Sequence, residues 1–274
     1  MSKDVMNPLK PRTASSESIL GAFKGLRLPG MANQFQLQMD TLAANGDRPF
    51  NERLEELCSA ELNNRSTHRI NGLLQRAKLF NPAACPESID MRKERSMNKD
   101  LILELVSCSF VRQKRFVSFE GAAGTGKTFL ACALGNAACR NRYKVLCVNS
   151  EMFVQDLQLA EHAKTLSDKI EGFAKMDVLI LDDWLKKPLK TEDAQNVSSF
   201  MNACYGKCSL IFCSQFPSTE WYGRIDCEHT ASGGDSELAD AIMDRIINNM
   251  HIVSLSSTVS MRKFYSPTGE EIAR

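Results

Sequence analysis

The sequence lacks the features that mark disulfide-rich, metal-binding and membrane-spanning chains. Its ten cysteines contain no C-x-x-C pair and have no regular spacing, and its four histidines are scattered. We therefore expect reduced cysteines that pack as small apolar side chains, and no metal cluster. No apolar run approaches the roughly 20 residues that a membrane-spanning helix needs, and the start of the chain leads into no apolar leader segment. These absences predict a cytoplasmic protein with no membrane partner.

An excess of charge of either sign is also lacking. The chain has 34 lysines and arginines against 33 aspartates and glutamates, a formal net charge of +1. Global charge therefore does not indicate a nucleic-acid partner, and any basic surface must be local. The 274 residues are enough for one large domain with a substantial core and a second, smaller domain.

The most informative stretch matches the phosphate-binding pattern G-x-x-x-x-G-K-[ST]. It consists of Gly121, Ala122, Ala123, Gly124, Thr125, Gly126, Lys127 and Thr128, and with the next residue, Phe129, it forms the predicted nucleotide-binding segment. Aromatic and β-branched residues over 116–120 predict a strand before the loop, and the apolar residues after it predict a buried helix. A glycine-rich turn with a surface lysine would not account for this strand and helix.

A strand, a glycine-rich loop and a helix in this order suit a nucleoside triphosphate and magnesium. The glycines let the backbone wrap closely around phosphates, and the N–H groups at the start of the helix supply positive potential. We expect the Lys127 ammonium to reach the β- and γ-phosphates and the Thr128 hydroxyl to ligate Mg²⁺.

A second nucleotide motif follows at 178–183, where four apolar residues precede Asp182 and Asp183. The pattern predicts a buried parallel strand that ends in two carboxylates, and ligands of open α/β sheets bind at that end. Asp182 is expected to hold magnesium through water, and Asp183 to orient or deprotonate the attacking water. The alternative is an ordinary turn at the end of a strand.

Further apolar runs at 144–149, 209–213 and 251–255 predict three more strands, each separated from the next by helical patterns. The alternation indicates an α/β fold with a parallel five-stranded sheet flanked by helices. The strand at 209–213 ends in Ser214 and Gln215, which would place a polar group beside the γ-phosphate. The segment 98–100 resembles a guanine-specifying motif, but its aspartate is one place early and it precedes the phosphate loop, so we do not expect GTP.

The N-terminal third predicts a small all-helical domain over residues 1–97, followed by the nucleotide-binding domain over 98–274. Helices are expected at 18–26 and 31–43, then one from Asn51 and another after Asn63 and Asn64, with 81–86 as the start of a linker.

A basic stripe lies on the second of these last two helices. At about 100° per residue, Arg65, Arg69 and Arg76 fall on one side, and no acidic residue occurs between Glu61 and Glu87. Such an unneutralised stripe suits the phosphates of duplex DNA. A solvated helix face, or one docked on an acidic partner, is the alternative. Gly72 falls within the stripe and weakens the expectation of an unbroken helix there.

Taken together, these residues resemble the AAA+ ATPase superfamily and, more closely, the IstB-like ATP-binding proteins of insertion sequences, which are related to DnaC-type helicase loaders. The similarity runs from Leu26 to Lys263. Besides the phosphate loop, the matching segments are 28–31, 52–61, 181–184, 214–215, 238–245 and 260–263.

The resemblance implies ATP as the nucleotide and roles that spacing alone could not assign. Ser214 and Gln215 fall at sensor I, where Gln215 is favoured and Ser214 is second. Arg245 falls at the arginine finger that reaches a neighbouring subunit's ATP, and Arg262 falls at sensor II. From the residues alone, Arg245 stays undecided and local hydrogen bonding is preferred for Arg262. A finger that acts in trans requires an oligomer whose assembly ATP controls.

The function implied by the resemblance is an ATPase that assembles on double-stranded DNA and assists a cognate transposase in target selection or strand transfer. A helicase loader that binds a replicative helicase is the alternative, and a small-molecule kinase is disfavoured because it would not need the N-terminal helical domain.

Three departures from the family pattern are visible. Leu185 stands where many relatives have glycine, with a mild effect expected on the turn. Asp183 stands where many have the longer glutamate, which predicts slow hydrolysis. The polar loop 226–234 is extra and has no assigned role.

Overall fold

The computed structural model describes residues 15–41, 48–91, 97–231 and 233–256. The chain divides into two compact units, Met1–Arg69 and Ile70–Arg274. The predicted boundary between residues 97 and 98 lies later in the chain than this division.

The first unit is helical, as the sequence predicts. It contains α1 (Ser16–Gly25), α2 (Pro29–Asp40) and the first part of α4 (Phe50–Ala77). Ser15 caps α1 through its side chain, whereas Leu28, at the start of α2, provides no side-chain cap. The missing cap is supplied from α4, because the Glu61 carboxylate accepts hydrogen bonds from the backbone N–H groups of Gly30 (2.8 Å) and Met31 (3.3 Å).

Gly30 is required where α2 meets α4 within the first unit. A Cβ atom at this position would lie 2.6 Å from the carbonyl oxygen of Ala60 and 2.7 Å from the Cα of Glu61. The absence of a side chain therefore allows the backbone contact through which Glu61 caps α2.

One helix of 28 residues, α4, replaces the two helices expected before residue 80. It passes through Asn63, Asn64 and Gly72 without a break, so the expectation of an interruption was wrong. The reason is packing: Leu73 and Ala77, on the last turns of α4, are buried in the core of the second unit, which outweighs the low helix propensity of glycine.

The second unit is built on a five-stranded sheet in which every pairing is parallel. The strands are β1 (Phe116–Glu120), β2 (Val145–Asn149), β3 (Val178–Asp182), β4 (Ser209–Ser214) and β5 (Met250–Ser254). Their order across the sheet is β2-β3-β4-β1-β5, so β3, β4 and β1 are neighbours. The predicted α/β class and the five strands are confirmed.

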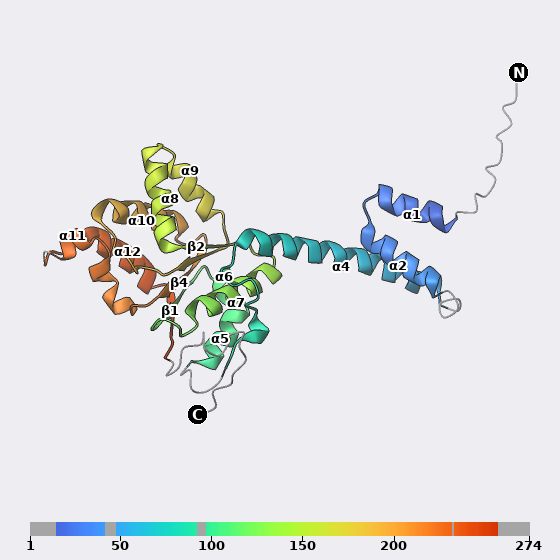
Figure 1. Cartoon of the computed structure of the whole chain (residues 1–274), viewed down its shortest axis with the longest axis horizontal. Coiled ribbons are helices and arrows are strands. Elements are labelled where there is room, and N and C mark those ends of the chain that lie inside the picture. Colours follow the sequence, from blue (N-terminus) through green and yellow to red (C-terminus); the bar gives the residue numbers. More distant parts are fainter. Residues whose placement is uncertain (1–14, 42–47, 92–96, 232, 257–274) are drawn as a thin grey trace, which may run out of the picture. The chain divides into compact units, whose positions relative to one another are not determined.

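Helices cover both faces of this sheet (Figure 1). One face packs on α5 (Lys99–Val106), α6 (Ser109–Arg112), α7 (Lys127–Arg140) and the segment that follows α4. The other face packs on α8 (Ser150–His162), α9 (Leu166–Ala174), α10 (Thr191–Cys204) and α12 (Glu237–Ile247). Alternate residues of β3 point to the two faces, with Val178 and Ile180 in one core and Leu179 and Leu181 in the other.

Short elements also occur among the described residues of the second unit: η1 (Pro86–Ser88), η3 (Ser218–Glu220), η4 (Tyr222–Arg224) and α11 (Cys227–Thr230). The side chains of Asn98 and Ser236 cap α5 and α12 by accepting hydrogen bonds from backbone N–H groups. No helix in the described part of the chain is long and apolar enough to cross a membrane.

The contact at Gly30 yields a stability prediction. Gly30→Ala should lower the free energy of unfolding of the first unit by about 1–3 kcal/mol, because the new methyl group must push α2 away from the backbone of α4. Gly21→Ala is the matched control, since nothing lies within 4 Å of a Cβ atom there, and it should be neutral or stabilising. Urea unfolding followed by circular dichroism measures both; equal stability of the two variants would contradict the assignment.

Candidate functional site

A cavity of about 530 Å³ opens at the carboxyl ends of β1, β3 and β4. The phosphate loop and the start of α7 form one wall, and Asp183 and Gln215 belong to another. Its full lining is Phe80, Asn81, Ala83, Ser88, Asp90, Ala123, Gly124, Gly126, Lys127, Thr128, Phe129, Asp183 and Gln215. Because β3, β4 and β1 are adjacent, their carboxyl ends bring these separate sequence motifs together.

The phosphate loop has the backbone that its glycines permit. Gly121, Gly124 and Gly126 have φ angles of +147°, +85° and +92°, a region that other residues rarely adopt. A Cβ atom at Gly121 would lie 2.2 Å from the carbonyl oxygen of Leu255, just after β5. The loop is therefore closed tightly against the sheet, and α7 begins directly after Gly126.

Lys127 is buried within the loop, where its ammonium donates hydrogen bonds to the carbonyl oxygens of Gly121 (2.7 Å) and Ala122 (2.8 Å). These bonds place a positive charge at the bottom of the cavity. Thr125 and Thr128 lie on either side of the lysine in sequence, and Thr125 closes the loop by donating to the carbonyl oxygen of Ala122 (3.0 Å).

Thr128 and Asp182 connect the two nucleotide motifs. The Thr128 hydroxyl donates to the Asp182 carboxylate at 2.9 Å, although the residues are 54 positions apart. Burial raises the pKa of Asp182 above its ordinary value, while the hydrogen bond from Thr128 opposes that rise and the nearby Asp183 adds to it. The Thr128 hydroxyl and the Asp182 carboxylate therefore lie side by side. Both offer oxygen ligands, the type of donor that Mg²⁺ prefers.

Asp183 follows Asp182 in left-handed backbone (φ +55°) and forms an ion pair with Lys186 at 3.1 Å. Leu185 is also left-handed (φ +54°), and its side chain is buried. A left-handed conformation costs a non-glycine residue roughly 1–2 kcal/mol. The mild effect expected of leucine on this turn stays a prediction. The angle also explains why glycine suits this position.

Of Ser214, the last residue of β4, and Gln215, the next residue, only Gln215 lines the cavity. Ser214 is fully buried: its hydroxyl donates to the carbonyl oxygen of Trp184 (2.9 Å) and accepts from the backbone N–H of Phe216 (3.2 Å). Ser214 therefore ties the end of β4 to the turn after β3, and Gln215 is exposed and directed to the cavity.

The segment after α4 supplies cavity residues that the sequence did not indicate. Phe80, Asn81 and Ala83 were expected to lie at the end of a helix and in a linker, and Ser88 and Asp90 had no role. Prolines at 82 and 86 mark turns, but no local pattern shows that those turns fold over α7. The aromatic ring of Phe80 is half exposed.

The remaining predicted residues lie outside this cavity. Arg245 is half buried on α12, where its guanidinium bonds to the carbonyl oxygen of Ala241. Arg262 falls outside the described residues, so its role stays a prediction. Arg65, Arg69 and Arg76 are all exposed on α4.

The description of this stripe as unneutralised was wrong for one member. Arg65 forms an ion pair with Glu61 at 2.7 Å, and the Arg65 side chain is 62% exposed while that of Glu61 is 6% exposed. Arg65 and the backbone N–H groups of Gly30 and Met31 lower the pKa of Glu61. The spacing of four residues along a helix brings the two charges together even though Glu61 precedes the acid-free segment.

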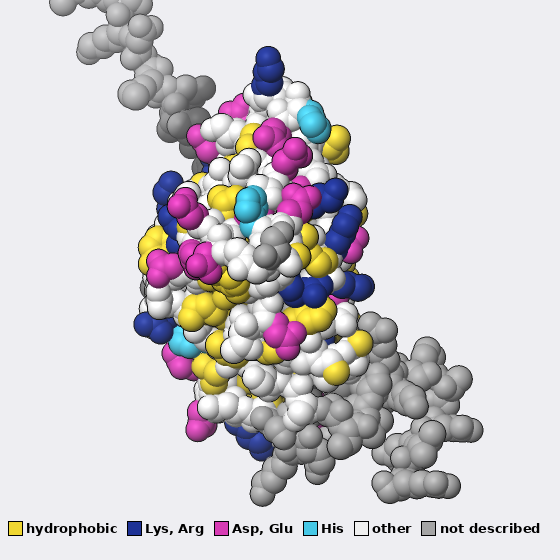
Figure 2. All heavy atoms as spheres, turned by 90° about the vertical axis from the view of Figure 1, so that its left-hand side faces the viewer, with side chains coloured by type: hydrophobic (Ala, Val, Ile, Leu, Met, Phe, Trp, Pro, Cys, Tyr) yellow, Lys and Arg dark blue, Asp and Glu magenta, His cyan; other side chains and the backbone are white. Residues whose placement is uncertain are grey.

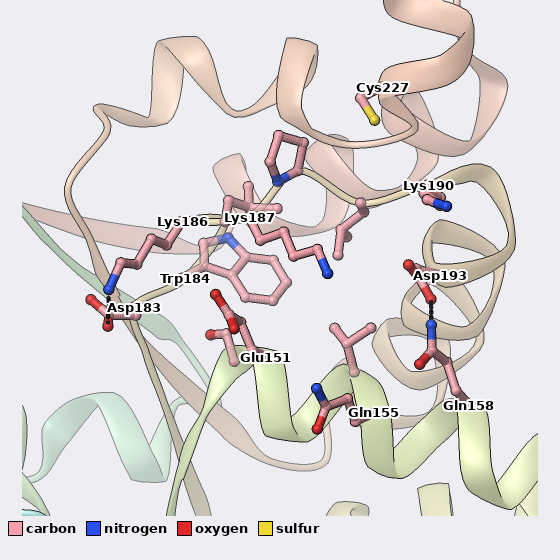
Figure 3. Close-up of a pocket in the computed structure, with 15 residues that line it drawn as sticks. Glu151, Gln155, Gln158, Asp183, Trp184, Lys186, Lys187, Lys190, Asp193 and Cys227 are labelled. Atoms are coloured by element: carbon pink, nitrogen blue, oxygen red, sulfur yellow. Dashed lines mark hydrogen bonds and ion pairs between the residues drawn. The ribbon is translucent and has the colours of Figure 1, made fainter.

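A second cavity, of about 370 Å³, adjoins the first at Asp183. Glu151 and Gln155 of α8 lie on one side of this space, and Trp184 and Lys187 of the turn after β3 lie on the other (Figure 3). Lys186 extends to Asp183, and Gln158 donates to Asp193 of α10. The charges around this cavity are mixed. Figure 2 shows a similar mixture over one face of the second unit, where basic and acidic side chains are interspersed.

Comparison with known proteins identifies relatives that match most of the chain. The family model of the IstB-like ATP binding protein matches residues 21–266. A putative insertion sequence ATP-binding protein of Sinorhizobium fredii is 31% identical over 90% of this chain and 96% of its own length. The insertion sequence IS1162 putative ATP-binding protein of Pseudomonas fluorescens is 35% identical over 74% of this chain and 88% of its own.

Solved structures share the fold at lower identity. DnaA from Aquifex aeolicus with bound AMPPCP matches with a TM-score of 0.52 and 19% identity, covering 68% of this chain and 54% of that one. DnaI matches with a TM-score of 0.52 and 17% identity over 68% of this chain and 94% of its own. At this identity the likenesses concern the fold alone, and they agree with the predicted α/β fold with a parallel sheet.

The burial of Asp182 yields a prediction about stability and pH. Because its pKa is raised in the folded protein, ionisation costs stability as the pH rises above the unfolded value of about 3.9. Asp182→Asn should therefore raise the thermal unfolding midpoint at pH 7 without nucleotide or divalent cations. The difference from the unsubstituted protein should shrink as the pH approaches about 4.

Thermal unfolding across this pH range, followed by circular dichroism, tests the prediction. Asp156→Asn, at a half-exposed position on α8, controls for the loss of one negative charge. A lower midpoint for Asp182→Asn than for the unsubstituted protein at pH 7 would contradict the prediction.

Proposed function

The chain belongs to the IstB-like ATP-binding protein family, and from this premise we propose that it is an ATPase that assembles on double-stranded DNA and assists a cognate transposase. The observation that carries the ATP-binding part of the proposal is the hydrogen bond between Thr128 and Asp182, which joins a residue of the cavity lining to the carboxylate at the end of β3. A site of this composition suits a triphosphate with its metal ion.

In this proposal the segment 121–129 binds ATP. The N–H groups of the glycine-rich loop and of the first turn of α7 bind the β-phosphate, and Lys127 moves its ammonium from the loop carbonyls to the β- and γ-phosphates. Phe80 and Asn81 line the cavity beyond the loop, so they contact the nucleoside.

Thr128 and Asp182 would hold Mg²⁺, Thr128 directly and Asp182 through water. The ion supplies charge neutralisation for the phosphates when it is bound. The oxygen donors and the close Thr128–Asp182 distance fit this assignment. Binding of the cation also offsets the cost of the buried Asp182 charge.

Asp183 is the proposed residue that orients or deprotonates the attacking water, and Gln215 positions the γ-phosphate. Lys186 pairs with Asp183, and aspartate has a shorter reach than glutamate. Both features favour slow turnover, which suits a switch that times assembly. Ser214 contributes by holding the turn after Asp183 rather than by touching the phosphate.

Arg245 is the proposed arginine finger. It does not line the nucleotide cavity of its own chain, so a contact with ATP requires a neighbouring subunit. ATP at one site would then stabilise the oligomer. Arg262 is the proposed sensor II residue on the basis of family resemblance alone.

Arg65, Arg69 and Arg76 are the proposed DNA contacts. All three are exposed on α4, and no ion pair is found for Arg69 or Arg76 within the described part of the chain. Arg65 contributes least, because its charge is shared with Glu61. A helicase loader with a related fold would use its N-terminal unit for a protein partner instead.

The role proposed for Asp183 yields a prediction about hydrolysis. Asp183→Asn should lower kcat for ATP about 100-fold or more, because an amide cannot take up the proton of the attacking water, while the Kd for ATP changes little. Phosphate release and titration of a fluorescent ATP analogue measure the two quantities. Asp156→Asn on α8 serves as the charge control. A rate for Asp183→Asn within twofold of the unsubstituted protein would rule out the assigned role.

The proposed DNA contacts on α4 yield a prediction about the affinity for duplex DNA and its dependence on salt. The double variant Arg69→Ala/Arg76→Ala should weaken ATP-dependent binding to random duplex. It should also reduce the slope of log K against log salt by about one for each phosphate that the variant no longer neutralises. Fluorescence anisotropy at several salt concentrations measures both. Leaving Arg65 in place keeps the cap of α2 intact.

Arg112→Ala/Arg115→Ala is the matched control, since both arginines are exposed and belong to the second unit, outside α4. Equal affinity and slope for the two double variants would remove the stripe from the proposal. Capture of a replicative helicase but no transposase by the tagged protein would favour the loader.

A further inference from the structure

Arg224 binds the turn that carries Asp183. Its Nε donates to the carbonyl oxygen of Leu185 at 2.7 Å, and its Nη2 donates to the carbonyl oxygen of Lys186 at 2.8 Å. A guanidinium can span two successive carbonyl oxygens because its donors are coplanar and fixed in direction. These two bonds reach across the fold, since Arg224 lies 39 positions after Leu185 in the chain.

The turn needs such support because its backbone is strained. Asp183 and Leu185 both have left-handed φ angles, and neither is glycine. Left-handed backbone is unfavourable for a side chain such as leucine, and it persists only where the surroundings hold it. Part of the support comes from Trp184 between them, whose indole is buried and whose backbone N–H donates to the carbonyl oxygen of Cys213 (2.8 Å). Arg224 supports the other side of the turn.

Arg224 also contacts the residue that follows Gln215. Its guanidinium carbon lies 3.7 Å from the centre of the Phe216 ring. A cation stacked at this distance stabilises the ring position. Phe216 is further held by its bond to Ser214, which in turn bonds to Trp184. One side chain thus touches both segments that carry the cavity residues Asp183 and Gln215.

The chain after Arg224 continues this connection to α12. Asp226 is buried, and its carboxylate accepts from Thr191 at the start of α10 (2.7 Å) and from Ser236 at the start of α12 (2.6 Å). Ser236 caps α12, the helix on which Arg245 lies. The loop 226–234, which the sequence left without a role, therefore begins with a residue that fixes the starts of two helices.

We propose that Arg224 is a positioning residue for ATP hydrolysis: it fixes the Asp183 turn and the Gln215 segment relative to one another. The proposal rests on the proposed ATPase function. Arg224 determines the spacing between Asp183 and Gln215. It does not bind the nucleotide, because it lines neither cavity. A misplacement near 1 Å of a reacting group can cost about 100-fold in rate.

The test compares Arg224→Ala and Arg224→Lys with Arg140→Ala, which removes an exposed arginine that pairs with Glu87 at the surface. For Arg224→Ala, kcat should fall about 10- to 100-fold while the Kd for ATP stays within about threefold. Arg224→Lys should stay slow, because an ammonium cannot span both carbonyl oxygens. Millimolar guanidinium should restore part of the rate of Arg224→Ala, which general destabilisation would not explain.

Two outcomes would overturn the proposal. One is a kcat for Arg224→Ala equal to that of Arg140→Ala. The other is that Arg224→Ala loses ATP affinity and kcat to the same extent and is not rescued by guanidinium. That result would mean that Arg224 only stabilises the site in general. If Arg224→Ala does not fold, full activity of Arg224→Lys would also overturn it.

Subunit mixing separates this proposal from the proposed function. Asp183→Asn subunits keep Arg245, so they should restore hydrolysis in Arg245→Ala neighbours but not in Arg224→Ala neighbours. Rescue of Arg224→Ala would overturn a role within its own subunit. Failure to rescue Arg245→Ala would contradict the arginine-finger role of Arg245 but would leave the proposal for Arg224 standing. Normal hydrolysis by Asp183→Asn subunits alone would contradict the role of Asp183.

Discussion

The position of β4 between β3 and β1 is the constraint on which the site depends. Parallel pairing aligns the carboxyl ends of these three strands, so that the phosphate loop, Asp182 and Gln215 emerge at one edge of the sheet. The Thr128–Asp182 hydrogen bond is a direct result, because it links the residue after the loop lysine to the end of β3. Both apolar cores lie behind this edge and hold the strands in register.

Functional strain is concentrated just beyond that edge. Asp183 and Leu185 adopt conformations that glycine would accept more easily, and the surrounding fold compensates through Trp184, Ser214 and Arg224. The buried charge of Asp182 is a second cost, expressed in its raised pKa. A nucleotide-binding site that stores such costs is less stable without its ligand, and ligand binding then supplies stability as well as chemistry.

In the first unit, a charged side chain on one helix caps the start of another helix. Glu61 caps α2 because Gly30 lets the backbones of α2 and α4 approach each other. Glu61 also forms an ion pair with Arg65, which leaves less of the Arg65 charge for DNA. The same helix, α4, thus carries a structural carboxylate and the proposed DNA contacts. Its last turns are buried in the second unit, so α4 belongs to both units.

Local pattern was sufficient for the strands, the phosphate loop, the two carboxylates and the fold class. Phosphate binding needs glycines and a lysine at fixed spacing, and a buried strand needs a continuous apolar run, so both leave a local record. Only tertiary structure decided that α4 is a single helix, that Ser214 is buried while Gln215 faces the cavity, and that Phe80 lines the same cavity. Arg224 and Asp226 belong to the same class, because their partners lie far away in sequence and a polar residue in a loop carries no sign of which distant group it will contact.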